Sequence, residues 1–286
     1  TSFRFQPTGF IPNARGPFVY SDKLELLGYL NSKVCLMFLN IIAPTLTYNV
    51  GDVCRIPCKE VTDTKVHDMV EDTISESKKD WDSFETSWDF KVHPLVRCKS
   101  FSPEEVAEDA KHNIVDMNYV KEAVKRWSNE CYLRFQKLKE NEEELNRIFI
   151  DIYGLQDELT PEVEDKDITV HRVFENRDEV PDSMKNSNYT RTYRDEIVSL
   201  LSYAVGCMFG RYSIYKDGLL FAGEPYSLQA FVDKLNDRPG TISAEELQRA
   251  YRNEGIVVDE MFFPDADNVI PITDEEYLDD DIVSRL

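Results

Sequence analysis

Eleven residues, DWDSFETSWDF at 80–90, concentrate side chains that can carry out acid–base chemistry. The stretch holds four carboxylates and four aromatic side chains: Asp80, Asp82, Glu85, Asp89, Trp81, Phe84, Trp88 and Phe90. Neighbouring carboxylates need a metal ion or a proton-transfer partner to become catalytic, and the surrounding sequence places neither with them. Helical spacing puts the tryptophans and Phe84 on one face and scatters the acids. We therefore expect a helical packing and hinge element, with its aromatic rings inward and its acids in solvent.

A second pattern, D…E-x-K, is typical of nucleases. Asp151, Glu164 and Lys166 fit it, with the acids as magnesium ligands and the lysine orienting water. Such a metal site needs a rigid strand framework, which the local sequence does not predict. A chain with 54 acidic residues also produces this pattern by chance. An independent nuclease is the weakest of three functional hypotheses.

Cysteine and histidine spacing does not predict a metal site. Cys54 and Cys58 form CRIPC, but zinc would need a second pair or histidines at suitable spacing. The cysteines follow no disulfide framework and are expected to be reduced and mostly buried: Cys35, Cys54, Cys58, Cys98, Cys131 and Cys207. The histidines are isolated and are expected at the surface or at helix caps: His67, His93, His112 and His171.

Motifs for cofactor chemistry are missing from the sequence. There is no glycine-rich cofactor loop, no Asn-Pro-Pro-Tyr type loop for gripping a flipped base, no Walker loop and no G-x-S-x-G. Gly206 and Gly210 lie in AVGCMFGRY, which we interpret as helix. We predict no catalytic, cofactor-binding or metal-binding residue in this chain.

Composition indicates a soluble globular chain of one or two domains. The 286 residues are 42% hydrophobic and 30% charged. The longest apolar runs, such as VCLMFL at 34–39, are far shorter than a bilayer span, so no membrane association is expected. The first residues show no signal peptide, which favours a cytoplasmic location. They also lack an initiator methionine, which we interpret as the start of a fragment.

Charge is unevenly distributed along the chain. The total is −21, yet residues 1–58 hold five basic and three acidic side chains, a net of +2, which leaves −23 for 59–286. Phosphate contacts need clustered lysine and arginine, so any DNA contact is predicted within 1–58. Asn13, Arg15 and Lys33 are the candidates, because arginine and asparagine read base edges and basic groups hold phosphate. Ordinary surface polarity is the alternative for each.

Periodicity predicts an α+β fold that is mainly α. Short strands are expected over 1–20, and a flexible insertion over 175–190. Residues 46–58 are expected to form a strand, a turn at Asn49–Gly51 and a second extended piece. A first helix is expected over 22–42, capped by Ser21 and ended by Pro44. Further helices are expected from 64 into the 80–90 stretch, from Ser102, over 117–152 and over 190–209. Capping boxes at 243–246 and 273–276 predict two more helix starts.

Five blocks, in this order, carry a resemblance to a known family: LGYLNSKVCLMFLNIIAPTLTYNVGDVCRIPC, KKDWDSFETSWDFKVHPLV, RFQKLKENEEELNRIFIDIYGLQDELTPEVEDKDITV, SYAVGCMFGRYS and DNVIPITDEEYLDDDIV. They resemble the C-terminal part of the PglX family, the adenine-specific DNA methyltransferases of BREX phage-defence systems. Related type II restriction-modification methyltransferases are similar. The resemblance covers most of the chain and is weakest at 175–190 and 225–255.

The resemblance implies that the parent enzyme transfers a methyl group from S-adenosylmethionine to adenine N6 in double-stranded DNA. The family's catalytic and cofactor motifs lie upstream, so none of its catalytic residues is carried over to this chain. Residues 1–58 would end a target-recognition region and 59–286 would form an acidic helical spacer. The partners implied are the upstream methyltransferase domain and, through it, DNA. The alternative is a protein-interaction module that docks other BREX subunits.

Overall fold

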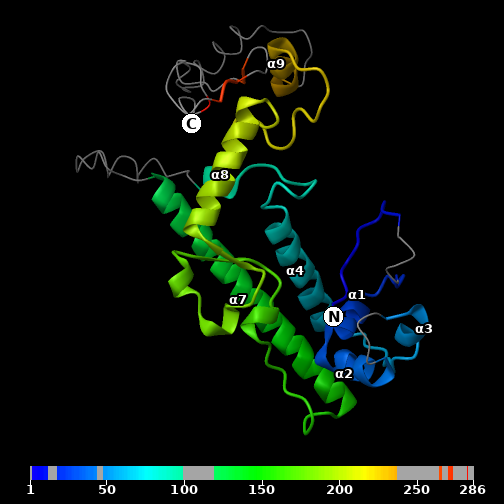
Figure 1. The fold of residues 1–286 in the computed structure, drawn as a ribbon. Coiled ribbons are helices and arrows are strands. Elements are labelled where there is room, and N and C mark those ends of the chain that lie inside the picture. Colours follow the sequence, from blue (N-terminus) through cyan, green and yellow to red (C-terminus); the bar gives the residue numbers. More distant parts are fainter. Residues whose placement is uncertain are drawn as a thin grey trace. The chain divides into compact units, whose positions relative to one another are not determined.

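A computed structural model describes most of the chain, and its contacts divide the chain into two compact units (Figure 1). The described residues are 2–11, 18–43, 48–98, 119–236, 264–265, 270–272 and 282. Unit 1 comprises residues 1–80, 130–172 and 180–190. Unit 2 comprises residues 81–129, 173–179 and 191–286. The functional boundary predicted at residue 58 follows neither unit and stays a prediction.

The helix predicted over 22–42 is two helices in the structure, α1 (Leu24–Asn31) and α2 (Lys33–Ile42). Ser32 separates them in an extended conformation and caps α2, because its Oγ accepts a hydrogen bond from the Cys35 N–H. Serine favours such caps because its hydroxyl replaces a missing backbone partner. Among the described helices no single one is long and apolar enough to cross a membrane. Helices α1 and α2 reach the required length and apolar composition only when they are taken together across a 64° bend.

Residues 46–58, predicted as a strand, a turn at Asn49–Gly51 and an extended piece, contain a short helix, α3 (Val50–Val53), which begins at the predicted turn. The Asn49 N–H donates to the Asp52 carboxylate at 3.0 Å, a reciprocal cap that the N-x-x-D spacing encodes. The strands expected in the first 58 residues are not found in the parts of that segment that the structure describes. The overall prediction of a mainly helical α+β fold is nevertheless confirmed.

Unit 1 is built around α4 (Thr64–Trp81) and the second half of α7 (Tyr119–Tyr153). The long helix predicted over 117–152 is thereby confirmed. Apolar side chains from these helices meet those of α1 and α2 in one buried cluster: Tyr29, Val34, Cys35, Leu39, Ile56, Val66, Val70, Leu145, Phe149 and Ile150. Each large apolar side chain buried in this way contributes about 1.5–3 kcal/mol to folding. The cluster joins residues on both sides of position 58.

The DWDSFETSWDF stretch is not the helix that its spacing predicts. Helix α4 ends at Trp81, and residues 82–89 form consecutive turns. Trp81 and Trp88 are 59% and 94% exposed, so the expectation that these aromatic rings point inward is wrong for both tryptophans. Phe90 is buried as expected, whereas the carboxylate of Asp80, which was expected in solvent, is also buried.

Unit 2 continues with α5 (Pro94–Arg97), the first half of α7, α8 (Tyr193–Met208) and α9 (Leu228–Asn236). Helix α8 confirms the helix predicted over 190–209. Gly210, which was interpreted as helical, instead follows α8 with a φ of +69°, a left-handed conformation that glycine adopts without strain.

Residues 172–192 form a short folded segment. Strands β1 (Arg172–Phe174) and β2 (Thr190–Thr192) pair in a two-stranded sheet. Between them lie two 3-10 turns, η2 (Arg177–Glu179) and η3 (Asp182–Met184), and a further turn, η1 (Asp165–Asp167), precedes β1. Val180 and Met184 are buried, so the segment predicted to be a flexible insertion is packed. The predicted helix start at Ser102, the end at Pro44 and the capping boxes at 243–246 and 273–276 lie outside the described residues.

The close packing of α1 generates a stability prediction for Gly28. A Cβ built at Gly28 would lie 2.8 Å from Val70 Cγ2 and 3.6 Å from atoms of Leu145 and Phe149. Gly28→Ala should therefore lower the free energy of unfolding by about 1–2 kcal/mol, because overpacking outweighs the gain in helix propensity. The measurement is the midpoint of urea denaturation.

The matched control is Gly51→Ala in α3, where a Cβ would meet nothing within 4 Å. This variant should unfold at an unchanged or slightly higher urea concentration. Equal behaviour of the two variants would contradict the packing described for α1.

Candidate functional site

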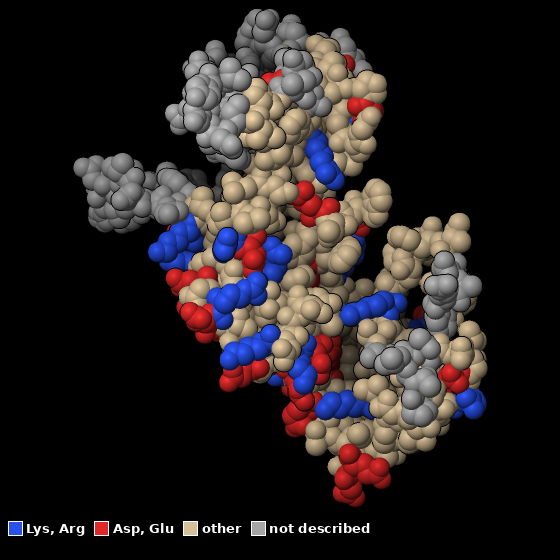
Figure 2. Space-filling view, in the orientation of Figure 1, with Lys and Arg blue, Asp and Glu red and all other residues tan. Residues whose placement is uncertain are grey.

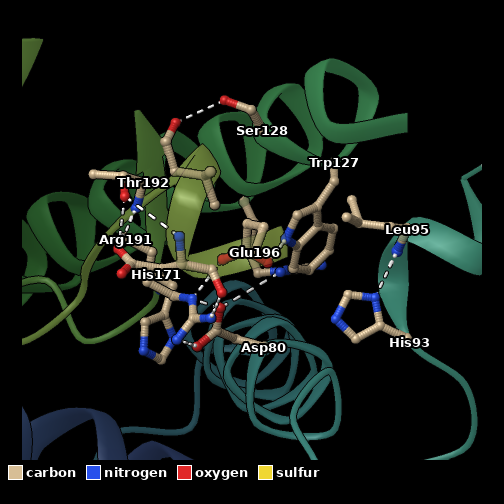
Figure 3. Close-up of polar contacts among 12 residues, drawn as sticks. Asp80, His93, Leu95, Trp127, Ser128, His171, Arg191, Thr192 and Glu196 are labelled. Atoms are coloured by element: carbon tan, nitrogen blue, oxygen red, sulfur yellow. Dashed lines mark hydrogen bonds and ion pairs between the residues drawn. The ribbon is translucent and has the colours of Figure 1, made fainter. Parts of the chain in front are cut away.

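A buried carboxylate organises the polar interior of unit 2. Glu196, on the first turn of α8, is 1% exposed and accepts a hydrogen bond from Trp127 Nε1 of α7 at 2.9 Å (Figure 3). Its other oxygen accepts from Arg191 Nε in β2. A buried carboxylate is stable only when such partners replace its lost hydration. Glu196 thus fixes Arg191 and the start of α8 against α7.

The sequence TRTYRDE sets this geometry locally. Thr192 caps α8: its N–H donates to the Asp195 carboxylate at 2.7 Å, and its Oγ1 accepts from the Asp195 N–H at 3.4 Å. This reciprocal cap begins the helix at Tyr193 and turns Glu196 inward. Burial acts to raise the pKa of Asp195, but the hydrogen bonds from Thr192 and the nearby arginines lower it.

Beside this cap lies an open cleft of about 700 Å³, which we call the arginine cleft. Its lining comes from the turn after α4, from η2, and from β2 with the first turns of α8: Phe84, Glu85, Thr86, Arg177, Arg191, Thr192, Arg194, Asp195, Val198, Ser199 and Ser202. Three arginines and two carboxylates line the cleft, and Arg191 is already paired with the buried Glu196, so the basic groups left exposed are Arg177 and Arg194. The arrangement suits an anion, because guanidinium and hydroxyl groups both donate hydrogen bonds to one.

The arginines of the cleft differ in how firmly they are held. Arg191 is tied to Glu196 and lies over the Phe84 ring, with its guanidinium carbon 4.9 Å from the ring centroid. Arg177 is 64% exposed and pairs with Asp195 at 3.2 Å. Arg194 is exposed. Exposed ion pairs contribute little to stability, so Arg177 and Arg194 are available to a ligand at small cost.

Glu85 is the carboxylate of the opening stretch that faces this cleft. Burial raises its pKa, and the charge of Arg211 and a hydrogen bond with Ser202 oppose that rise. Its Oε1 atom is buried and has no hydrogen-bond partner among the described residues. A carboxyl in such a place is neutralised more readily than one in water, which further limits negative charge in the cleft.

Unit 1 holds a separate buried cluster of charged side chains. Arg134 Nη1 of α7 lies 3.5 Å from Asp80 Oδ1, and Arg134 Nη2 lies 2.9 Å from Glu130 Oε1. Asp80 Oδ2 is 2.8 Å from His171 Nδ1, and Asp80 Oδ1 accepts from the His171 N–H at 3.1 Å (Figure 3). His171 was predicted to be isolated, but in the structure it is paired with Asp80. These contacts join the end of α4, α7 and residue 171, and we interpret them as a structural brace.

The predicted DNA-binding residues are only partly visible. Asn13 and Arg15 lie outside the described residues. Lys33 begins α2; its backbone N–H donates to Asn146 Oδ1 at 2.9 Å, and its Nζ donates to the Glu162 carbonyl. Lys33 is thus engaged within unit 1, and its role in DNA contact stays a prediction. Sequence reasoning missed the arginine cleft, whose residues lie far apart in the sequence and outside the basic N-terminal segment.

The residues of the nuclease pattern make other contacts. Asp151 accepts from Gln156 at 2.9 Å, and Lys166 pairs with Glu164. Across the described ranges, no group of three or more histidine, cysteine or acidic side chains is arranged to hold a metal ion. Cys54 and Cys58 are exposed thiols, in contrast to the buried Cys35, Cys131 and Cys207. The nuclease hypothesis gains no support from these contacts.

Figure 2 shows basic and acidic side chains intermingled on the face that it draws. The ion pairs Lys137–Asp72 and Lys139–Asp165 in unit 1, and Lys125–Glu122 in unit 2, agree with this mixing. That face therefore does not present a large surface of uniformly positive or uniformly negative charge to a ligand. On this face, a nucleic-acid contact would need a local group of exposed basic side chains.

Comparison with known proteins confirms the family resemblance. The chain is 34% identical over 284 residues, 98% of its length, to the adenine-specific methyltransferase PglX of Lacticaseibacillus casei (strain Zhang). It is 28% identical over 292 residues to the adenine-specific methyltransferase BrxX of Escherichia coli O9:H4 (strain HS). These matches span 19% and 20% of the two relatives, so the chain covers about a fifth of their length. No protein-family profile matches the chain.

The buried network predicts a large effect of removing Glu196. Glu196→Ala removes the carboxylate that accepts from Trp127 Nε1 and from Arg191 Nε, which should cost about 3–5 kcal/mol of unfolding free energy. The measurement is urea denaturation followed by tryptophan fluorescence. Glu122→Ala is the control, because Glu122 makes only an exposed pair with Lys125 and should cost below about 0.5 kcal/mol. A similarly small cost for both variants would refute the role given to Glu196.

The burial of His93 leads us to predict that the chain loses stability in acid. It is buried and caps α5, with its Nδ1 accepting from the Leu95 N–H at 3.2 Å (Figure 3). Burial, with the charge of Arg191, lowers its pKa to about 4. The unfolded chain binds this proton below about pH 6.5, so the free energy of unfolding should fall as the pH drops from about 6.5 to about 4.

Asparagine is the substitution that isolates this effect, because it can accept the same capping hydrogen bond but does not titrate. His93→Asn should show a smaller decrease in unfolding free energy across that pH window than the unsubstituted chain. Parallel pH profiles would show that His93 is not the titrating group.

Proposed function

We propose that this chain is a non-catalytic C-terminal segment of an adenine-specific DNA methyltransferase of a phage-defence system. It would combine the end of a target-recognition region with a helical spacer. Similarity along nearly the whole chain to proteins named as adenine-specific methyltransferases is the observation that carries the proposal. The parent enzyme would transfer a methyl group from S-adenosylmethionine to adenine N6.

The described residues do not fit a site for S-adenosylmethionine. Such cofactors sit on a glycine-rich turn between a strand and a helix. Here the junction of β2 with α8 is formed by Thr192 and Tyr193, and the residue after β1 is Glu175, so neither position has the glycine of such a turn. We therefore derive no step through the cofactor and assign its binding to the part of the parent enzyme upstream of this segment.

The partners proposed are double-stranded DNA, reached through the parent enzyme, and the upstream methyltransferase domain. A cytoplasmic location without membrane contact belongs to the same proposal. The structure supports a positioning role, since its buried charges tie helices to one another. Asp80 and Glu196 are both committed to such contacts.

A second candidate is a protein-interaction module that docks other BREX subunits. The charge of −23 on residues 59–286 and the 94% exposure of Trp88 favour it, because exposed tryptophans are common at protein interfaces. Capture of purified BREX proteins by the chain, undiminished by excess duplex DNA, would favour this function over DNA contact.

The proposal predicts salt-dependent binding of the 286-residue chain to fluorescently labelled duplex DNA, measured by anisotropy. Each phosphate contact that forms releases counterions from the DNA, and added salt opposes that release, so the affinity should fall steeply between about 50 and 200 mM salt. If the N-terminal candidates contribute, Arg15→Ala should weaken binding and reduce the salt slope by about one. Absence of binding at low salt would contradict a DNA-contacting role for this chain by itself.

A further inference from the structure

We propose that the arginine cleft of unit 2 is a DNA-contact site, in which Arg177 and Arg194 hold backbone phosphate and Trp88 packs against a neighbouring base. The inference rests on the proposed function and names a surface for it outside the basic N-terminal segment. The sequence had directed DNA contact to residues 1–58. The cleft instead combines residues from the turn after α4, η2 and the start of α8.

Phosphate is the ligand chemistry that the cleft favours. Arg177 and Arg194 present exposed guanidinium groups, which bind phosphate oxygens in pairs. Hydroxyl groups of Thr86 and Ser199 line the same space and can donate to a phosphate. The opposing carboxylate Asp195 is already satisfied by the Thr192 cap, so a phosphate can replace it as the partner of Arg177.

The turn that contributes residues to the cleft also carries an exposed aromatic side chain. Trp88 is 94% exposed, although tryptophan is on average a highly buried residue. It follows the lining residue Thr86 by two positions, so the chain keeps their Cα atoms within about 7 Å. Trp88 does not line the cleft itself; from its place in the same turn, its exposed ring would offer an unpaired base a surface to stack on while the arginines hold phosphate. A methyltransferase that extrudes its target base provides such unstacked bases.

An acidic peptide of a partner protein is the competing ligand, because carboxylates also pair with arginine. DNA is favoured because Trp88 adds a surface for a base, and because exposed hydroxyls pair readily with phosphate oxygens. The two ligands differ in what the loss of Trp88 should do. Base stacking is lost on substitution of Trp88, whereas pairing of a polyglutamate peptide with arginine is not.

The test is the binding of the 286-residue chain to labelled DNA carrying one unpaired adenine, measured by anisotropy across a salt series. Arg177→Ala/Arg194→Ala should weaken binding about tenfold and reduce the salt slope by about two. Trp88→Ala should weaken binding about tenfold with an unchanged slope. Arg147→Ala is the matched control, since Arg147 is 56% exposed and paired with Glu144, as Arg177 is with Asp195.

The outcomes separate this inference from the proposed function. Loss of affinity in the cleft variants, with Arg147→Ala unchanged, supports it. DNA binding that is unaffected in the cleft variants overturns the cleft and leaves the proposed function standing. Weaker binding of polyglutamate but not of DNA in the double arginine variant also overturns it, in favour of a protein partner. A chain that binds no DNA at low salt contradicts both.

Discussion

The burial of the Glu196 carboxylate is the constraint on which the architecture of unit 2 depends. An ionised carboxylate taken from water costs several kcal/mol unless donors replace its hydration, and Trp127 and Arg191 supply them. This requirement brings α7, β2 and the first turn of α8 to fixed positions. Arg191 is thereby held at the cleft beside Phe84, while Arg177 and Arg194 remain exposed to solvent. Two exposed guanidinium groups therefore border the cleft in an otherwise acidic chain.

Unit 1 also buries carboxylates, and there the main partner is an arginine of α7. Its apolar cluster joins α1, α2, α4 and α7, and Arg134 neutralises the carboxylates that α4 turns inward. Asp80 then orients His171 through two contacts, although this pair resembles the acid–base couples of enzymes. Buried charges in both units therefore serve to position helices. That use fits the positioning role proposed for this segment.

The sequence predicted the long elements well because their periodicity is strong. Helices α7 and α8 appear where apolar spacing placed them, and the family resemblance was confirmed. Local caps explain two differences from the prediction: Ser32 divides one expected helix, and Asn49 with Asp52 starts a helix where a turn was expected. Tertiary contacts misled it too, since spacing alone cannot show that α4 ends at Trp81 and leaves Trp88 in solvent.

The candidate site was beyond sequence reasoning for a related reason. Glu85, Arg177 and Arg194 are about 90 and 20 positions apart, and only the fold brings them to one cleft. Net charge directed the prediction of DNA contact to the N-terminal segment. A sum of charges does not show which basic side chains are left exposed after others form ion pairs. The acids of the opening stretch proved to serve different ends: Asp80 braces unit 1, and Glu85 lines the cleft of unit 2.

Hydrogen–deuterium exchange of the chain with and without duplex DNA tests the central claim most directly. The measurement reports which backbone segments are covered by DNA without altering any side chain. The account predicts slower exchange at residues 84–88, 177–179 and 191–195 when DNA is bound. Protection confined to residues 1–58, or exchange that DNA leaves unchanged throughout, would contradict it.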